Sequence, residues 1–230
     1  MHEFIASSTY FGVFVSLAAY FLGMLFRKKT RLAIFNPLLV SVILVIALLS
    51  VLKIDYAAYN QSAKLLSSLL TPATICLAVP LFEQITLLKK HKNAILLGVL
   101  SGVMTSLVCV LILSLLFGLD HANYVTLLPK SITTAIGMGV SEELGGYVSI
   151  TVAVILLTGI LGNMIAQSVC RIFGITEPVA RGVAIGTSSH AIGTTRAMEL
   201  GEIEGAMSGL SIVIAGVLTV AYASVFSYIL

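Results

Sequence analysis

The stretch LPKSITTAIGMGVSEELGG, from Leu128 to Gly146, is too polar and too rich in glycine for an ordinary membrane helix, although it lies in a very apolar chain. A second stretch of the same kind, EPVARGVAIGTSSHAIGTTRAMELGE, runs from Glu177 to Glu202. Both contain Ala-Ile-Gly followed by five residues and a glutamate, and a long apolar segment follows each. Polar segments broken by glycine or proline, at matching places in two halves of a membrane protein, are typical of a transport site.

The composition places the chain among integral membrane proteins. Of its 230 residues, 58% are hydrophobic and only 10% are charged, so its long apolar segments are expected to lie in hydrocarbon. Such segments form helices, because a helix pairs its backbone groups within one span. We therefore predict an all-α polytopic membrane protein in the lipid bilayer. It would have roughly six to eight transmembrane helices of about 20 residues each, and two broken or re-entrant segments.

The charges and cysteines argue against several other classes. The net charge of +3 is small and lies in the loops, so no nucleic-acid partner is expected. Cys76, Cys109 and Cys170 are isolated in apolar segments, with neither metal-ligand spacing nor a disulfide framework. The chain shows no nucleophile–base spacing and no phosphate loop. We expect no enzyme, no cofactor and no bound metal.

Apolar runs predict the course of the chain. The predicted spans are 4–26, 32–52, 63–88, 93–117, 147–173 and 205–230. The third should be interrupted at Pro72 and Pro80, because each proline removes a backbone donor. We expect one membrane domain, with N-terminal spans in residues 1–118 and both polar stretches in residues 119–230. A weak internal repeat with a period near 60 residues also runs through the sequence.

Positive charge predicts the orientation of the chain. Lysine and arginine are concentrated in residues 27–31 and 89–92, which places these loops in the cytoplasm and both termini outside. No lysine or arginine precedes the first apolar run, so a cleaved signal peptide is not expected. Arg171 and Arg181 place the loop between them in the cytoplasm, which favours two re-entrant polar stretches entering from opposite faces. Two crossing stretches, and eight spans in all, are the alternative.

Short hydroxyl side chains crowd both polar stretches. At a break in a membrane helix they either cap freed carbonyls or, with N–H groups at half-helix N-termini, bind a small carboxylate. Lys130 either attracts an anion or extends toward the interface. The substrate-binding hydroxyl candidates are Ser131, Thr133, Thr134, Thr187, Ser188, Ser189, Thr194 and Thr195. Gly137, Gly139, Gly186 and Gly193 are candidate hinges, with close helix packing as the alternative.

The ionisable residues of these stretches are the most specific candidates. A charge inside a membrane segment costs about 2.5–3.5 kcal/mol on insertion scales, so it indicates a function by default. His190 could relay a proton. Arg196 could clamp a carboxylate, or it could pair with Glu199 three residues further on. Glu142 and Glu143 could carry protons or cations, or form a solvated turn.

The same stretches carry a family resemblance. The runs PKSITTAIGMGVSEELGG, TGILGN and ARGVAIGTSSHAIGTTRAMELGEIEGAMSGL together resemble the LrgB/CidB family, over essentially the whole chain. The resemblance implies a bacterial cell-membrane location and a small LrgA/CidA-type partner protein. It also implies a distant similarity to cation/proton antiporters and bile-acid symporters, whose broken helices cross at the midplane.

Two competing functions follow from this resemblance. Some members are described as holin-like or antiholin-like regulators of murein hydrolase activity and lysis. Others, including the LrgB-like part of a plastid glycolate/glycerate translocator, move small carboxylates. A hole needs only a few apolar helices, whereas matched broken stretches with arginine and histidine suit a carrier. We therefore favour a homo-oligomeric transporter or facilitator of monocarboxylates such as pyruvate, lactate or glycolate, coupled to H+ through His190 or a glutamate. A holin-like or antiholin-like regulator is the alternative.

Overall fold

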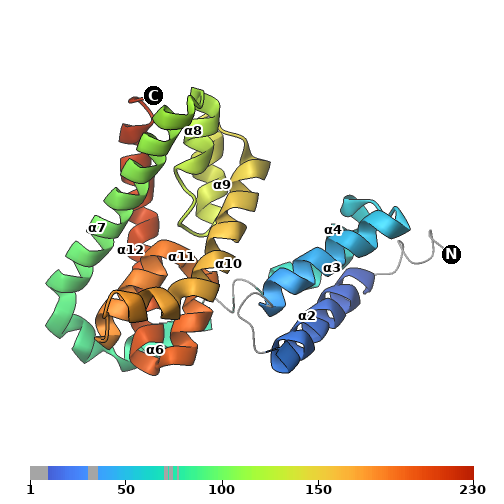
Figure 1. Ribbon diagram of the computed structural model, residues 1–230, viewed down its shortest axis with the longest axis horizontal. Helices are drawn as coiled ribbons and strands as arrows, with labels where there is room; N and C mark the ends of the chain where they lie inside the picture. The colour runs from blue at the N-terminus through green and yellow to red at the C-terminus, as the bar shows by residue number, and fades with distance from the viewer. Residues whose placement is uncertain (1–9, 31–35, 70–71, 73–74, 77) are drawn as a thin grey trace. The chain divides into compact units, whose positions relative to one another are not determined.

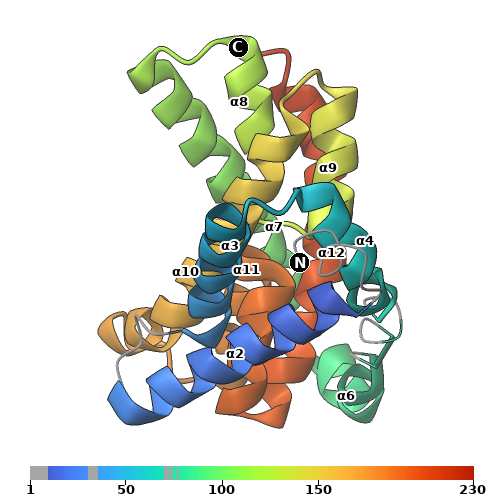
Figure 2. The same ribbon diagram turned by 90° about the vertical axis from the view of Figure 1, so that its right-hand side faces the viewer.

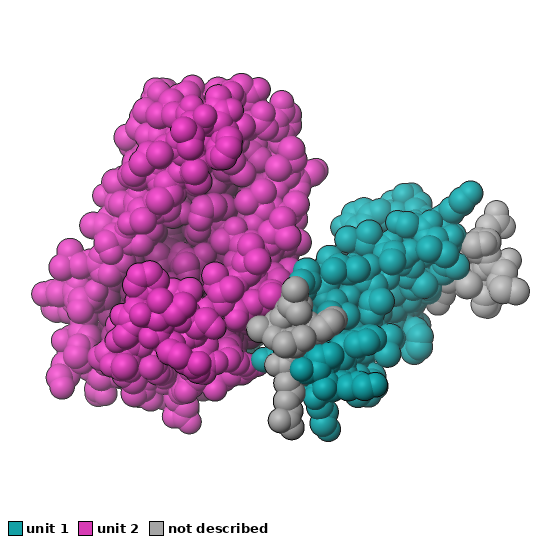
Figure 3. Space-filling model, viewed as in Figure 1, with its two compact units in different colours: residues 1–76 teal, residues 77–230 magenta. Residues whose placement is uncertain are grey.

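The computed structural model of the protein describes residues 10–30, 36–69, 72, 75–76 and 78–230. Every regular element among them is an α-helix, as the composition predicts. The chain forms two compact units, residues 1–76 and 77–230, which are coloured separately in Figure 3. The predicted division between residues 118 and 119 and the internal repeat stay predictions.

The first unit contains helices α2 (Phe11–Thr30), α3 (Pro37–Leu52) and α4 (Tyr56–Ser68). Helices α2 and α4 approach closely at Gly12, whose backbone N–H donates to Ser62 Oγ over 2.9 Å. A Cβ at Gly12 would lie 2.6 Å from this hydroxyl oxygen, so the contact requires glycine. The first residues of the predicted spans 4–26 and 32–52 lie outside the described residues.

The second unit holds both polar stretches. Its helices are α6 (Ala78–Glu83), α7 (Ile85–Phe117), α8 (His121–Leu127), α9 (Thr134–Glu143), α10 (Val148–Ile172), α11 (Pro178–Leu200) and α12 (Glu202–Phe226) (Figure 1). Val99 and Leu107 of α7, Tyr124 of α8 and Met207 of α12 are almost completely buried in one core. The hydroxyl of Tyr124 donates to the carbonyl of Phe226 over 3.0 Å, which fixes the end of α12 against α8.

Four helices of the described chain are long and apolar enough to cross a membrane. They are α2, α7, α10 and α12, and the apolar helix α3 is shorter. Large apolar side chains on these helices face outward; Leu116 of α7, for example, is 74% exposed. Helices of this length and surface are typical of a multi-pass membrane protein.

The predicted span 63–88 is wrong. Helix α4 ends at Ser68, α6 begins only at Ala78, and Ile85 already belongs to α7. Pro80 lies inside the short helix α6, while Pro72 lies between α4 and α6. The lysine cluster 89–92, predicted as a loop, lies within α7, because lysine is a good helix former and does not end a helix.

The first polar stretch doubles back on itself. Helix α8 ends at Leu127, and α9 begins at Thr134 after a turn. The hydroxyl of Thr151 lies against both arms of this hairpin. It is 2.9 Å from the carbonyl oxygen of Thr126 on the first arm and 2.7 Å from the hydroxyl of Ser141 on the second. With seven and ten residues, α8 and α9 are each too short to cross a bilayer. Both lie at the end of the unit where the C-terminus lies (Figures 1 and 2).

The second polar stretch also doubles back, within α11. The helix breaks at His190, whose φ of 43° and ψ of −144° are not helical. Ser208 of α12 contacts both arms. On the first arm, a Cβ added at Gly186 would lie 2.8 Å from Cα of Ser208. On the second arm, the hydroxyl of Thr194 lies 2.7 Å from the hydroxyl of Ser208. In a straight helix, Gly186 and Thr194 would be about 12 Å apart.

The two hairpins start from opposite ends of the unit. The first hairpin (121–143) begins after α7 and leads into the start of α10, while the second hairpin (178–200) begins after the end of α10 and leads into α12. Their tips point toward each other. Hairpins that start from opposite ends are what the re-entrant alternative requires, and their placement in the membrane stays a prediction.

The close contact between α11 and α12 generates a prediction for stability. Gly186→Ala should lower the free energy of unfolding by about 1–3 kcal/mol, because the added methyl group would collide with the backbone of Ser208. Gly139→Ala, also in a helix but with nothing within 4 Å of an added Cβ, is the matched control and should not destabilise. Thermal unfolding of both purified variants measures the difference; equal melting temperatures would contradict the packing of α11 on α12.

Candidate functional site

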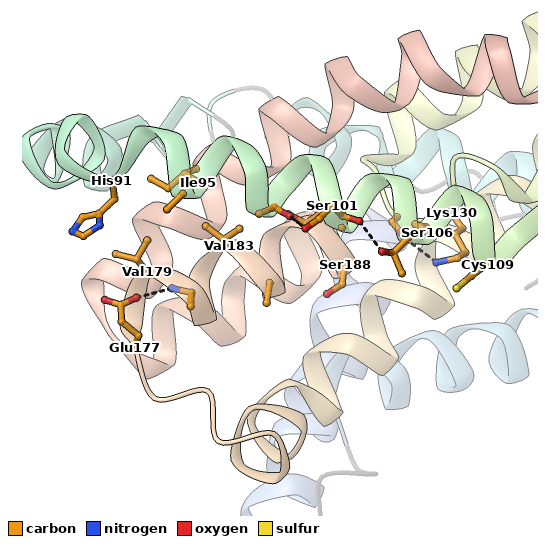
Figure 4. Close-up of a pocket in the computed structure, with 18 residues that line it drawn as sticks. His91, Ile95, Ser101, Ser106, Cys109, Lys130, Glu177, Val179, Val183 and Ser188 are labelled. Carbon is orange, nitrogen blue, oxygen red and sulfur yellow. Dashed lines mark hydrogen bonds between the residues drawn. The ribbon is translucent and has the colours of Figure 1, made fainter.

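The tips of the two hairpins meet between two cavities. The larger cavity, of about 800 Å³, lies between α7 and the first arm of α11 (Figure 4). The smaller, of about 450 Å³, lies between α10 and α11. Lys130 from the first tip lines both cavities, and so do Ala184 and Ser188 from the first arm of α11. The residues at the two tips are therefore the natural candidates for a site.

The larger cavity has one hydroxyl-rich end. There Lys130 Nζ donates to Ser131 Oγ over 3.0 Å, and the hydroxyls of Ser131 and Ser106 lie 3.2 Å apart. Figure 4 shows Lys130 beside Ser106 and Cys109 at this end, with His91 and Glu177 at the other. Apolar side chains line the groove between the two ends. One end of the cavity therefore presents an ammonium group and hydroxyls, and the remainder is mostly apolar.

Helix N-termini add to the positive character of the tips. Helix α9 begins after Thr133, whose side chain does not cap it, and Thr134 is its first residue. The second arm of α11 begins after His190. The N-terminus of a helix carries unpaired N–H groups and a partial positive charge, both of which favour an anion. Thr133 and Thr134 do not line either of the two cavities.

His190 fastens the second tip to α10. Its ring is buried, and Nε2 lies 3.0 Å from the carbonyl oxygen of Ile155. A Cβ at Gly159 would lie 2.6 Å from Cε1 of the ring, so glycine makes room for the imidazole. His190 lines neither cavity. The contacts give it a structural role, and its role in proton coupling stays a prediction.

Arg196 lies on the second arm, away from both cavities. Its guanidinium donates to the carboxylate of Glu199 and to the side-chain carbonyl of Gln167. One turn earlier, the Asn163 amide donates to the carbonyl of Ile192 over 2.9 Å. These contacts bind the second arm to α10, and they occupy the guanidinium that the sequence offers as a carboxylate clamp.

The remaining predicted residues are distributed around the tips. Ser189 lines the smaller cavity, and its hydroxyl lies 3.0 Å from that of Ser188. The hydroxyl of Thr194 forms a hydrogen bond with the hydroxyl of Ser208. Thr195 is exposed, and its hydroxyl accepts a hydrogen bond from the side-chain amide of Asn163. Glu142 and Glu143 are exposed at the far end of α9. No cluster of metal-ligating side chains occurs in the described part of the chain.

The four glycines proposed as hinges lie at different kinds of position. A Cβ added at Gly137 would lie 2.4 Å from Cδ1 of Ile155 and 3.6 Å from Cβ of Pro129, and one added at Gly193 would lie 2.5 Å from Cβ of Ser189. Gly186 packs on α12, whereas Gly139 is open to its surroundings. Three of them therefore occupy close contacts, and a hinge role stays a prediction.

Sequence reasoning missed the wall that α7 contributes. Small residues at helical spacing line the larger cavity from Gly98 to Cys109, where the sequence pattern predicts only an apolar span. Gly98 and Gly102, with the hydroxyls of Ser101, Thr105 and Ser106, make that face unusually small and polar for a membrane helix. This spacing, GxxSGxxTS, is the signal that could have identified the face.

The fold and the site define a multi-pass α-helical membrane protein with two opposed helical hairpins. A model of the LrgB-like family matches residues 16–229, so the chain belongs to this family. It is 36% identical over 218 residues to antiholin-like protein LrgB of Bacillus mycoides (strain KBAB4), a match that covers 94% of this chain and 95% of the relative. The proteins of the same name from Bacillus cereus (strain B4264) and Bacillus anthracis (strain CDC 684 / NRRL 3495) match equally well.

No solved structure matches the chain. The likeness to cation/proton antiporters and bile-acid symporters therefore stays a prediction.

The position of Lys130 generates a prediction for reactivity at Cys109, which is exposed and lines the larger cavity. In a protein carrying Cys76→Ser and Cys170→Ser, Lys130→Gln should slow the reaction of Cys109 with an anionic thiol reagent about fivefold relative to a neutral one. The reason is the loss of roughly 1 kcal/mol of Coulomb attraction near the thiol. Lys92→Gln, in the exposed part of α7, is the matched control. An unchanged ratio of the two rates in Lys130→Gln would show that the charge does not act in this cavity.

Proposed function

We propose that this protein acts as an antiholin-like membrane protein that modulates murein hydrolase activity and lysis in the bacterial cell membrane, together with an LrgA-type partner. The observation that supports it is the 36% identity, over 94% of the chain, to proteins named antiholin-like protein LrgB. Of the two functions that the sequence raises, the relatives support this one better than monocarboxylate transport.

The proposal predicts a phenotype in the cell. Deletion of the gene should raise murein hydrolase activity and shorten the time to lysis by several-fold, and expression of the protein should reverse both. The measurements are zymography of cell-wall hydrolases and the fall of optical density after a membrane-depolarising agent. Deletion of the partner gene is the parallel control. Identical lysis with and without the protein would contradict an antiholin-like role.

A second candidate function, passage of small carboxylates, is supported by the geometry of the hairpins. Two opposed broken segments meet beside a lysine and a cluster of hydroxyls, with helix N-termini at both tips. Discontinuous helices that point their N-termini at the membrane midplane are how several transporter folds hold an anion. A structureless hole would not need this arrangement. Changes in lysis would then follow indirectly, from carboxylate and proton balance.

The carrier function predicts different effects of substitutions at Lys130 and at Arg196. Uptake of radiolabelled pyruvate or glycolate into proteoliposomes should fall at least tenfold in Lys130→Gln, because Lys130 lines both cavities. Arg196→Gln should retain uptake, because Arg196 is engaged by Glu199 and Gln167. Trapped dye reports nonspecific leakage. Loss of uptake only in Arg196→Gln would assign the clamp to Arg196, and dye release without solute preference would exclude a carrier.

A further inference from the structure

The larger cavity is much longer than a small carboxylate. Its wall on α7 runs from His91 to Cys109, which is about 27 Å of helix at the ordinary rise per residue. Its volume of about 800 Å³ lies in the range that holds drug-sized ligands, whereas pyruvate and glycolate have only a handful of heavy atoms. Ile95 from α7 and Val179 and Val183 from α11 supply an apolar lining along its length.

A single cation without an acidic partner stands at one end of this groove. Within the described residues, Lys130 has no carboxylate within ion-pair distance, and its ammonium group donates to Ser131. The two arginines of the second hairpin are paired, Arg181 with Glu204 at 3.8 Å and Arg196 with Glu199. A ligand bound at Lys130 therefore meets one unit of positive charge.

The opposite end of the groove carries the opposite charge. Glu177 lines that end and accepts the backbone N–H of Ala180 over 2.8 Å, so it is oriented at the start of α11. A second carboxylate at the far end of a bound ligand would face the carboxylate of Glu177, with the imidazole of His91 beside it and no lysine or arginine among the described residues that line this end. The charge pattern of the groove consequently favours a ligand with one anionic head and an uncharged remainder.

Among the described residues, one buried hydroxyl of the groove has no hydrogen-bonding partner. Thr187 is 95% buried, and within the described chain its Oγ1 has no hydrogen-bonding partner. It stands beside Gly102 of α7, where a Cβ would lie 2.6 Å from Thr187 Cγ2. An unpaired buried hydroxyl destabilises the protein, so a ligand oxygen that accepts from it would bind more tightly.

We propose that this groove binds a monocarboxylate with an extended apolar tail. The carboxylate lies at Lys130 and Ser131, within reach of the hydroxyls around them, and the tail follows the apolar wall between α7 and α11. The inference rests on the second candidate function, carboxylate passage, and it specifies the class of carboxylate: longer aliphatic or aryl monocarboxylates are preferred, and dicarboxylates of equal length are rejected.

A series of carboxylates tests the proposal on the intact protein in nanodiscs. Binding is measured as protection of Cys109 from a neutral thiol reagent, in the Cys76→Ser, Cys170→Ser background. Affinity should rise from acetate to hexanoate to dodecanoate by up to about fourfold per buried methylene. Dodecanedioate, which matches dodecanoate in length but carries a second carboxylate, should bind at least tenfold more weakly than dodecanoate.

Substitutions at the two ends separate the head from the tail. Lys130→Gln should weaken the binding of all of these ligands, with Lys92→Gln as the matched control. Ala180→Phe, at the tail end, should abolish the advantage of dodecanoate over hexanoate and leave acetate binding unchanged. Ala166→Phe places the same bulk in the smaller cavity and should leave the chain-length preference as it is. If Ala180→Phe does not fold, Ala94→Phe on the opposite wall replaces it.

The outcomes distinguish this inference from the function on which it rests. Equal protection by acetate and dodecanoate, or dodecanedioate binding as well as dodecanoate, would overturn the proposed ligand class while carboxylate passage stands. Protection by dodecanoate that survives Lys130→Gln would also overturn it, because the tail alone would then be partitioning into the groove. If no carboxylate protects Cys109 and none is taken up by proteoliposomes, the carrier function fails and the inference fails with it.

Discussion

The break in α11 at His190 is the constraint on which the arrangement of the second unit depends. A non-glycine residue at φ 43° and ψ −144° costs about 1–3 kcal/mol and persists only where its surroundings hold it. The hydrogen bond between the imidazole and the carbonyl of Ile155 holds it on one side, and the Thr194–Ser208 hydroxyl pair holds it on the other. Because the chain reverses here, both arms of α11 lie against the same part of α12.

The reversal also determines where the charged side chains of the second hairpin lie. Arg181 and Arg196 end near its base, where glutamates and Gln167 engage them, while the tip carries hydroxyls and a buried imidazole. The first hairpin brings Lys130 to that tip from the opposite end. An unpaired cation in surroundings of low dielectric attracts an anion more strongly than it would in water. The position of that charge follows from two chain reversals and not from the abundance of basic residues.

An antiholin-like role and the passage of anions are compatible physically. A membrane protein that carries the anion of a weak acid alters the balance of acid and protons across the membrane, and cell-wall hydrolases act on the outer side of that membrane. The family relation supports the first role, and the paired hairpins support the second. The two roles differ in the quantity that the protein changes directly, which is hydrolase activity in one and solute flux in the other.

The sequence by itself determined the membrane class, the all-helical structure and the two places where helices break, because composition and local polarity decide these properties. It also offered the pairing of Arg196 with Glu199, since three residues of helix bring them together. It misplaced the predicted span 63–88, where lysines and prolines suggested helix ends in the wrong places. Only the tertiary structure decided that Ser131 meets Ser106, that Lys130 and Ser188 line the same cavities, and that Gln167 hydrogen-bonds to Arg196. These contacts join residues far apart along the chain, and such distances depend on the turns of the hairpins and the packing of α7, α10 and α12, which no local pattern encodes.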